Sequence, residues 1–202
     1  MLSYNESLKI LKETNALLEG HFILSSGLHS KQYIQCAKLL SIPEKAEKIC
    51  SSLCDKIREN YNDIDIILSP AIGGIVVGYE VGRLLKKETI FAERQEKKLL
   101  LRRGFKIKEN SKVLIVEDVI TTGKSALECV ELIKESKAKL AGYACIIDRS
   151  NNKNIIKDKI ISQIQFNIKT YQDNEIPDDL KKITPIKPGS RNLSKWPKRD
   201  LV

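Results

Sequence analysis

The stretch from Val113 to Ser125 reads VLIVEDVITTGKS and joins an apolar run, two carboxylates and a small hydroxylated turn. Its first four residues, up to Val116, are all apolar and predict a strand that is buried on both faces. Glu117 and Asp118 follow at the carboxyl end of this strand, and a helical pattern comes after the turn. The stretch therefore predicts a strand–turn–helix unit of a parallel α/β sheet.

The turn after this strand has the chemistry of a site for a phosphorylated sugar. Ligands of open parallel sheets bind outside the carboxyl ends of the strands, and a helix N-terminus offers free N–H groups to an anion. Gly123 lets the backbone approach a phosphate, and hydroxyl groups come from Thr121, Thr122 and Ser125. The two carboxylates suit sugar hydroxyls, or a Mg²⁺ ion that is shared with the ligand. The plainer alternative is an ordinary strand–turn–helix with solvated carboxylates.

The run Glu-Asp-Val-Ile-Thr-Thr-Gly at 117–123 resembles the ribose-phosphate signature of the type I phosphoribosyltransferases. It is neither a P-loop nor a dinucleotide-binding turn, because Gly-x-x-x-x-Gly-Lys and Gly-x-Gly-x-x-Gly are both missing. The resemblance implies a catalytic role for Asp118. The residues that it implies for binding 5-phosphoribosyl 1-diphosphate in this run are Glu117, Asp118, Val119, Ile120, Thr121, Thr122, Gly123, Lys124 and Ser125.

The composition of the chain restricts the classes of protein to which it can belong. With 202 residues, of which 42% are hydrophobic and 30% charged, it is expected to form a single globular domain. No apolar run approaches membrane-spanning length and the N-terminus does not resemble a signal peptide, so we expect a cytoplasmic protein without a membrane partner. The formal charge of +9 fits a polyanionic small substrate. Nucleic acid is a less favoured partner, because the basic residues are spread along the chain.

The cysteines and histidines do not indicate a metal site. The five cysteines are irregularly spaced and lack a Cys-x-x-Cys pair, so they are expected to be reduced and mostly buried. The two histidines, His21 and His29, have no metal-ligand spacing. A structural or hydrogen-bonding role is expected for both histidines, in preference to a catalytic one.

The N-terminal segment carries a second resemblance. Periodic apolar residues predict a helix from Tyr4 to Glu19 that stops at Gly20, and two short strands are expected around a Ser-Ser-Gly turn at 25–27. The run FILSSGLHS at 22–30, with a tyrosine three residues later, resembles the N-terminal segment of orotate phosphoribosyltransferases. Many of those enzymes carry a lysine where this chain has a serine, at position 25.

A second strand–turn–helix unit is expected downstream. Ser41 and Glu44 have the spacing of a capping box for a helix. A strand at 64–68 is followed by the turn SPAIGG and another helix, which is a second candidate anion site. In the resembling family this turn approaches the diphosphate, which implies roles for Ile72 and Gly73. The alternative is a turn that needs glycine for packing.

The segment from Glu93 to Asn110 is dense in charge, and most such runs are solvated faces. In the resembling family it corresponds to a flexible catalytic loop that closes over the active site, often that of a neighbouring subunit. The resemblance implies that Arg94 binds 5-phosphoribosyl 1-diphosphate and that Lys98 is catalytic, with Lys97 as the alternative. The family's Lys-Asp-His-Gly loop tip is absent.

A buried strand at 143–147 ends in Asp148-Arg149. An arginine at the carboxyl end of a strand can bind a carboxylate with both arms of its guanidinium, although a surface salt bridge is the alternative. The resemblance implies that Arg149 holds the carboxylate of orotate and that Thr121 also contacts the base. A half-exposed strand is expected at 164–168, where apolar and polar residues alternate.

These features together predict the fold. We expect an α/β fold, with a type I phosphoribosyltransferase-like parallel sheet flanked by helices. A single domain over residues 1–202 is divided into a core at roughly 41–149, a small hood at roughly 20–40 and 150–190, and a basic C-terminal extension at 192–202.

The implied reaction transfers the 5-phosphoribosyl group from 5-phosphoribosyl 1-diphosphate to orotate, giving orotidine 5'-phosphate and diphosphate in de novo pyrimidine biosynthesis. The resemblance also implies Mg²⁺ as a cofactor that the substrate carries, with no direct protein ligand, and a homodimer with a shared active site. Two alternatives stay open. A purine phosphoribosyltransferase would lack the orotate-type N-terminal segment, and a regulator on the same fold would bind nucleic acid in a salt-sensitive way.

Overall fold

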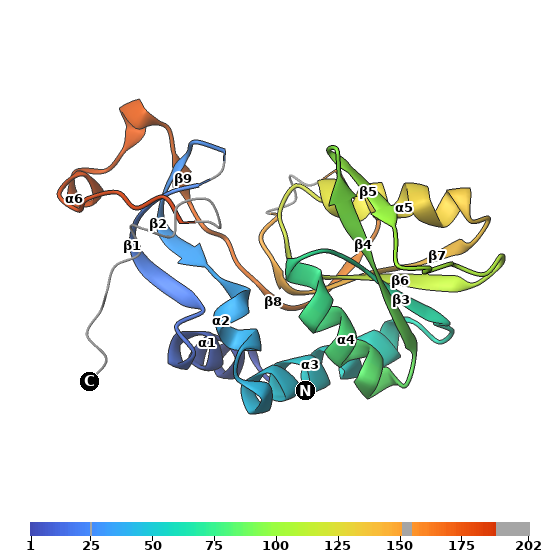
Figure 1. The fold of residues 1–202 in the computed structure, drawn as a ribbon. Helices are drawn as coiled ribbons and strands as arrows, with labels where there is room; N and C mark the ends of the chain where they lie inside the picture. The colour runs from blue at the N-terminus through green and yellow to red at the C-terminus, as the bar shows by residue number, and fades with distance from the viewer. Residues whose placement is uncertain (25, 151–154, 189–202) are drawn as a thin grey trace.

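The main sheet of the computed structural model has six strands in the order β5-β4-β3-β6-β7-β8 (Figure 1). The structure describes residues 1–24, 26–150 and 155–188. All neighbouring strands of this sheet are parallel except β5, which runs antiparallel to β4. The predicted parallel α/β sheet is thus confirmed. Its strands are β3 (Ile66–Pro70), β4 (Glu88–Gln95), β5 (Lys98–Leu101), β6 (Lys112–Ile120), β7 (Lys139–Asp148) and β8 (Ile160–Gln165).

Helices cover both faces of this sheet. Helices α3 (Pro43–Asn60) and α4 (Gly73–Leu85) lie on one face and α5 (Lys124–Glu135) on the other (Figure 1). Strand β6 is apolar on both sides: Leu114 and Val116 join the core under α3 and α4, while Val113 and Ile115 join the core under α5. The alternation places successive side chains on opposite faces, as the pleat of a strand requires.

The strand order reverses between β3 and β6. From β3 the chain crosses through α4 to β4 on one side, and from β6 it crosses through α5 to β7 on the other side. The loops that follow β3 and β6 therefore flank one crevice at the carboxyl edge of the sheet. This crevice is the place where open α/β sheets bind their ligands.

A second, three-stranded sheet forms the hood beside this edge (Figure 1). Its strands are β1 (Leu17–Ile23), β2 (His29–Ile34) and β9 (Thr170–Tyr171), with β2 in the centre. The short elements η1 (Asp173–Glu175) and α6 (Asp178–Lys181) follow β9, and Ile186 then pairs with the outer edge of β1 at Phe22. Both predicted short strands around the Ser-Ser-Gly turn are confirmed.

The first helix is shorter than predicted. Helix α1 (Tyr4–Glu13) ends before Thr14, whose hydroxyl donates back to the Ile10 carbonyl. Asn15 then has a φ of 52°, a left-handed conformation that redirects the chain into β1. The expected continuation to Glu19 is therefore wrong, because strand pairing with β2 overrides the helical periodicity there.

The expected capping box is also wrong. Ser41 ends the short helix α2 (Cys36–Leu40), and its hydroxyl donates to the Lys38 carbonyl at 2.9 Å. The N-cap of α3 is Ile42, without a side-chain hydrogen bond, and Pro43 supplies the first helical residue. Two helices meet where the spacing of Ser41 and Glu44 predicted one helix start.

The alternating segment at 164–168 contributes to the core more than to the hood. Ile164 is the last buried residue of β8, at the edge of the main sheet, and Phe166 and Ile168 are buried as the chain leaves that sheet. Only the short β9 enters the hood sheet. The predicted C-terminal extension at 192–202 and Ser25 lie outside the described residues. None of the helices that the structure describes is long and apolar enough to cross a membrane.

Candidate active site

The two carboxylates lie on β6 itself, because the strand continues past Val116 to Ile120 and pairs with β7 along this length. Glu117 is 9% exposed, and burial raises the pKa of its carboxyl to about 8. The neighbouring Asp118 adds to this rise, while a hydrogen bond from the Ala126 backbone opposes it. Burying a carboxylate without a cation disfavours its charged form, so Glu117 is ready to accept a partner that carries positive charge or hydroxyl donors.

Asp118 faces the crevice at the reversal of strand order. Its Oδ1 accepts a hydrogen bond from the Val119 backbone N–H at 2.9 Å. Burial raises the pKa of its carboxyl as well, and backbone hydrogen bonds reduce that rise. Because successive residues of a strand point to opposite faces, Glu117 lies toward α5, at the Ala126 backbone, and Asp118 lies toward α4, at Gly73. Both carboxyls have raised pKa values, which is typical of a functional site.

The turn from Thr121 to Gly123 leads directly into α5. Gly123 is the N-cap of α5, and its φ of 78° is a conformation that side chains disfavour. Thr121 and Thr122 are exposed and Ser125 is half-buried, so their hydroxyls are accessible. The N-cap itself has no side chain, although the Lys124 N–H donates to Thr122 Oγ1 at 3.4 Å and the Ala126 N–H to the Glu117 carboxylate. The rest of the first turn is open to an anion.

Ile155 and Ile156 lie against this turn. The Ile155 N–H donates to the Thr122 carbonyl at 3.0 Å. A Cβ built on Gly123 would lie 2.8 Å from the Ile156 side chain. Gly123 is thus required both by its backbone conformation and by the close approach of this segment.

Arg149 reaches the same crevice from β7. Its backbone N–H donates to the Ile120 carbonyl at 2.8 Å, which fixes the residue beside the turn. Its Nε is buried without a hydrogen-bond partner among the described residues, and burial lowers the pKa of its guanidinium. A buried N–H group without an acceptor is costly, and the carboxylate of a ligand could supply one here.

Tyr33, on β2 of the hood, lies near Arg149 and Asp118. Burial raises the pKa of the Tyr33 phenol, with the Arg149 guanidinium opposing this rise and the Asp118 carboxylate adding to it. The hood therefore supplies an aromatic ring to the crevice. The sequence contained this tyrosine inside the orotate-type segment, but nothing in the pattern singled out its role.

The loop after β3 forms the other wall. Ile72 is 86% exposed and precedes α4, and the Ala71–Ile72 peptide bond is cis. The Ala71 N–H donates to the Ala92 carbonyl at 2.8 Å, which anchors the loop to β4. Gly73 is the first residue of α4 and faces Asp118 across the crevice.

The segment predicted as a flexible loop begins as a tight β-hairpin. Strands β4 and β5 pair from Ala92–Leu101 to Gln95–Lys98, and the two turn residues Glu96 and Lys97 both have positive φ. Such turns match the twist of the strands that they join. The hairpin forms because Leu99 and the partly buried Leu101 pack into the core under α5. The many charged residues around these two leucines hid this strand in the sequence pattern.

The hairpin carries both predicted loop cations. Arg94 donates to the Lys97 carbonyl at 2.7 Å and to the Glu128 carboxylate on α5 at 2.8 Å. Lys98 is exposed at the start of β5. The structure places Arg94 close to α5 but pairs it with Glu128, a residue that the sequence pattern did not identify.

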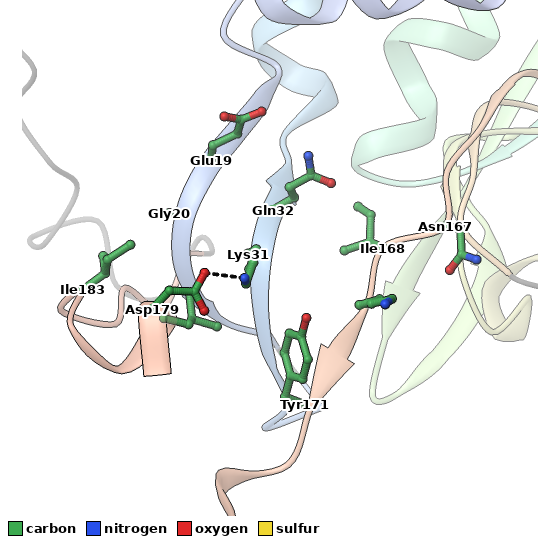
Figure 2. Close-up of a pocket in the computed structure, with 11 residues that line it drawn as sticks. Glu19, Gly20, Lys31, Gln32, Asn167, Ile168, Tyr171, Asp179 and Ile183 are labelled. Atoms are coloured by element: carbon green, nitrogen blue, oxygen red, sulfur yellow. Dashed lines mark hydrogen bonds and ion pairs between the residues drawn. The ribbon is translucent and has the colours of Figure 1, made fainter. Parts of the chain in front are cut away.

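One cavity of the described residues lies in the hood (Figure 2). It measures about 490 Å³, and Figure 2 shows Lys31 of β2 paired with Asp179 of α6 inside it. None of the predicted site residues lines this cavity. Asp118 and Arg149, which both lie near Tyr33, are instead at the carboxyl edge of the main sheet.

The two histidines join the segments of the hood. His21 Nδ1 is 2.9 Å from the Ile183 carbonyl, and His21 Nε2 is 2.6 Å from His29 Nδ1. His29 Nε2 is 2.6 Å from Asp173 Oδ1. Both imidazoles are buried, and this chain of contacts fits the predicted hydrogen-bonding role.

The described residues contain no cluster of three or more His, Cys, Asp or Glu side chains that could hold a metal ion. Glu117 and Asp118 supply only two carboxylates. This donor set fits a Mg²⁺ ion that brings most of its oxygen ligands from a phosphorylated substrate, as such ions commonly do. All five cysteines are free and buried, as predicted.

Comparisons with known proteins agree with this geometry. The family model described as "Phosphoribosyl transferase domain" matches residues 38–176. A protein of Caldicellulosiruptor saccharolyticus named orotate phosphoribosyltransferase is 45% identical over 186 residues, which cover 92% of this chain and 96% of that protein.

Two solved structures share the fold. The orotate phosphoribosyltransferase of Aeropyrum pernix superposes with a TM-score of 0.67 at 22% identity, covering 78% of this chain and 92% of that one. The adenine phosphoribosyltransferase of Thermoanaerobacter pseudethanolicus gives a TM-score of 0.58 at 15% identity, over 67% of this chain and 88% of that one. The family match and the 45% identical relative show that the chain belongs to the phosphoribosyltransferase family, in its orotate phosphoribosyltransferase branch.

Proposed function

We propose that this protein transfers the 5-phosphoribosyl group from 5-phosphoribosyl 1-diphosphate to orotate, giving orotidine 5'-phosphate and diphosphate. The observation that carries the proposal is the position of Arg149. Its guanidinium Nε is buried without a hydrogen-bond partner among the described residues, next to the turn that suits a phosphate. Orotate differs from the other common pyrimidine and purine bases in carrying a carboxylate, which Arg149 can bind with two parallel hydrogen bonds.

The 45% identical relative that is named orotate phosphoribosyltransferase supports the same substrate. Tyr33 adds a ring beside Arg149, so a planar base has an aromatic neighbour. Thr121, exposed at the start of the turn, is close enough in sequence to the Ile120–Arg149 contact to offer its hydroxyl to the base.

The remaining groups suit the sugar. The backbone and hydroxyls from Thr121 to Ser125 bind the 5'-phosphate at the start of α5. Glu117 and Asp118 accept hydrogen bonds from the ribose hydroxyls. As diphosphate leaves, the ribose carbon gains positive charge, and a preorganised carboxylate pair stabilises that charge without acting as a strong base.

The leaving diphosphate requires cations. Arg94 and Lys98 on the β4–β5 hairpin supply them, and Arg94 must exchange its pairing with Glu128 for the diphosphate. Ile72 and Gly73 offer the backbone of the opposite loop. A Mg²⁺ ion held by the substrate, with Glu117 and Asp118 as its nearest carboxylates, would neutralise diphosphate charge.

The test is the loss of orotate ultraviolet absorbance with purified protein, 5-phosphoribosyl 1-diphosphate and Mg²⁺. Adenine, hypoxanthine and uracil are the control bases. We expect consumption of orotate alone, and only when donor and metal are both present. Consumption of adenine or hypoxanthine in place of orotate would replace this proposal with a purine phosphoribosyltransferase.

We also propose that the protein works as a homodimer. Ile72, the N-cap of α4, is followed at helical spacing by Val76 and Tyr79 within α4, and the three are 86%, 50% and 66% exposed. Such an apolar stripe is unusual on a free surface and suits the symmetric contact of a second copy. Light scattering during gel filtration should give about twice the mass of one chain, and Tyr79→Glu should reduce it to that of a monomer. A monomeric wild-type protein would exclude this assembly.

A further inference from the structure

Gly73 and Asp118 come from the two loops that flank the reversal of strand order. Asp118 is on β6, and Gly73 begins α4 directly after the β3 loop. A Cβ built on Gly73 would lie 2.7 Å from Asp118 Oδ2, 2.9 Å from Oδ1 and 2.9 Å from Cγ. Real Cβ atoms essentially never come this close to other heavy atoms. The Asp118 carboxylate therefore occupies the space in which every residue other than glycine carries its side chain.

We propose that Gly73 is a positioning residue for Asp118. The missing side chain at position 73 lets the Asp118 carboxylate lie against the backbone of the opposite loop, between the groups that bind the ribose and those that bind the diphosphate. The catalytic consequence rests on the proposed function, whereas the packing contact does not.

The wider range of backbone conformations that glycine can adopt does not explain why residue 73 is a glycine. Gly73 is not among the glycines with a positive φ, and it lies in a helical turn that any residue can adopt. Glycine destabilises a helix relative to alanine, so its presence at this position has a cost. Glycine is therefore needed at position 73 because it has no side chain. At Gly123, in contrast, it is needed also for its backbone conformation, with a φ of 78°.

The start of α4 favours a carboxylate at this place. Its N-cap, Ile72, has no side chain that can accept a hydrogen bond, so the first turn has no side-chain cap. The Asp118 carboxylate lies at this positive end of the helix dipole. A side chain at position 73, a long cationic one included, would push Asp118 away from it.

The test is a double-mutant cycle between Gly73→Ala and Asp118→Ala, measured by the midpoint of thermal unfolding and, in the wild-type background, by kcat for orotate. Gly73→Ala should lower kcat by about 10- to 100-fold, because small displacements of a catalytic group are costly. It should lower the melting temperature by only a few degrees, because the Asp118 carboxylate can turn away from the new methyl group. In the Asp118→Ala background, the same substitution should shift the melting temperature much less.

Gly74→Ala is the matched control. The three atoms nearest to a Cβ on Gly74 would be from Ser69, Pro70 and the Val116 carbonyl, at 3.2–3.3 Å, and none of them belongs to Asp118. Its effect on the melting temperature should therefore be the same whether residue 118 is Asp or Ala.

Three outcomes would overturn the inference. The first is an equal loss of melting temperature from Gly73→Ala in both backgrounds, and the second is no loss of either stability or kcat. The third concerns folding: if Gly73→Ala does not fold, the double variant should fold, and its failure would show that the clash with Asp118 is not the cause. Absence of orotate turnover in the wild type would reject the proposed function, while the melting cycle would still decide the role of Gly73.

Discussion

The Arg94 guanidinium on β4 lies 2.8 Å from the Glu128 carboxylate on α5. This contact links the β4–β5 hairpin, which carries the predicted loop cations, to the helix that follows the Thr121–Gly123 turn. In the proposed reaction, Arg94 exchanges this contact with Glu128 for one with the diphosphate. Ion pairs that are partly exposed contribute about 0.2–1 kcal/mol, which sets the scale of this competition. Glu128→Gln should therefore lower the KM for 5-phosphoribosyl 1-diphosphate by up to about fivefold.

The control for this prediction is Glu131→Gln on the same helix. Glu131 pairs with Lys134 on the exposed face of α5 and should leave the KM unchanged. Steady-state kinetics at fixed orotate and Mg²⁺ would measure both variants. A higher KM in Glu128→Gln would mean that Glu128 orients Arg94 for binding and does not compete with the diphosphate.

Arg149→Lys should separate charge from geometry at the base site. Lysine keeps the positive charge but cannot form the planar two-point contact with a carboxylate. The KM for orotate should rise about tenfold, in keeping with the loss of one strong charge-assisted hydrogen bond. The KM for 5-phosphoribosyl 1-diphosphate should change by less than about twofold, because the guanidinium does not contact the donor.

The control is Arg58→Lys. Arg58 lies on the exposed face of α3, where it pairs with Asp55, and it is not among the predicted site residues. Equal effects of Arg149→Lys on the KM values of both substrates would remove Arg149 from specific recognition of the base.

His29→Phe should test whether the buried histidine pair is structural. The substitution keeps a ring of similar size but leaves His21 Nε2 without its 2.6 Å partner. A buried polar atom without a partner costs about 1–3 kcal/mol, and urea unfolding should show a loss of that size. In the folded variant, kcat for orotate should stay within about twofold of the wild-type value.

Asp173→Asn provides the comparison, because Asp173 is 90% exposed while His29 is buried. Its effect on the free energy of unfolding should be below about 1 kcal/mol. A large fall in kcat for His29→Phe without loss of stability would instead favour a catalytic histidine.

Local patterns in the sequence predicted most of the main sheet. Four consecutive apolar residues identify β6 because both of its faces are covered, and the small turn after it forms where it was expected. The predicted end of α1 was wrong because Leu17 and Leu18 fit a helical pattern as well as they fit the strand β1. The choice between the two depends on pairing with β2, which periodicity cannot show.

Contacts between segments that lie far apart in the sequence could not be predicted from local patterns. Tyr33 and Arg149 approach each other only because the hood closes over the carboxyl edge of the sheet. The Glu96–Lys97 turn carries no glycine or asparagine, so neither residue signals the hairpin in which both have positive φ. The role of Gly73 likewise depends on a side chain from another strand.

Glu117→Gln should change how the stability of the substrate-free protein depends on pH. Burial raises the pKa of Glu117 from 4.5 to about 8 in the folded state. The folded protein thus holds a proton that the unfolded chain releases, so the free energy of unfolding falls as the pH rises from about 4.5 to about 8. A shift of this size corresponds to at most about 4–5 kcal/mol. Glutamine mimics the protonated acid at every pH, so the variant should match the wild type near pH 4, below the pKa of the unfolded chain, and exceed its stability at pH 9. Urea unfolding of both proteins across this range, with Glu131→Gln as an exposed control, would measure the difference. A difference that does not vary with pH would show that Glu117 is ionised throughout the range in the folded protein, and that its burial is balanced by a partner other than the substrate.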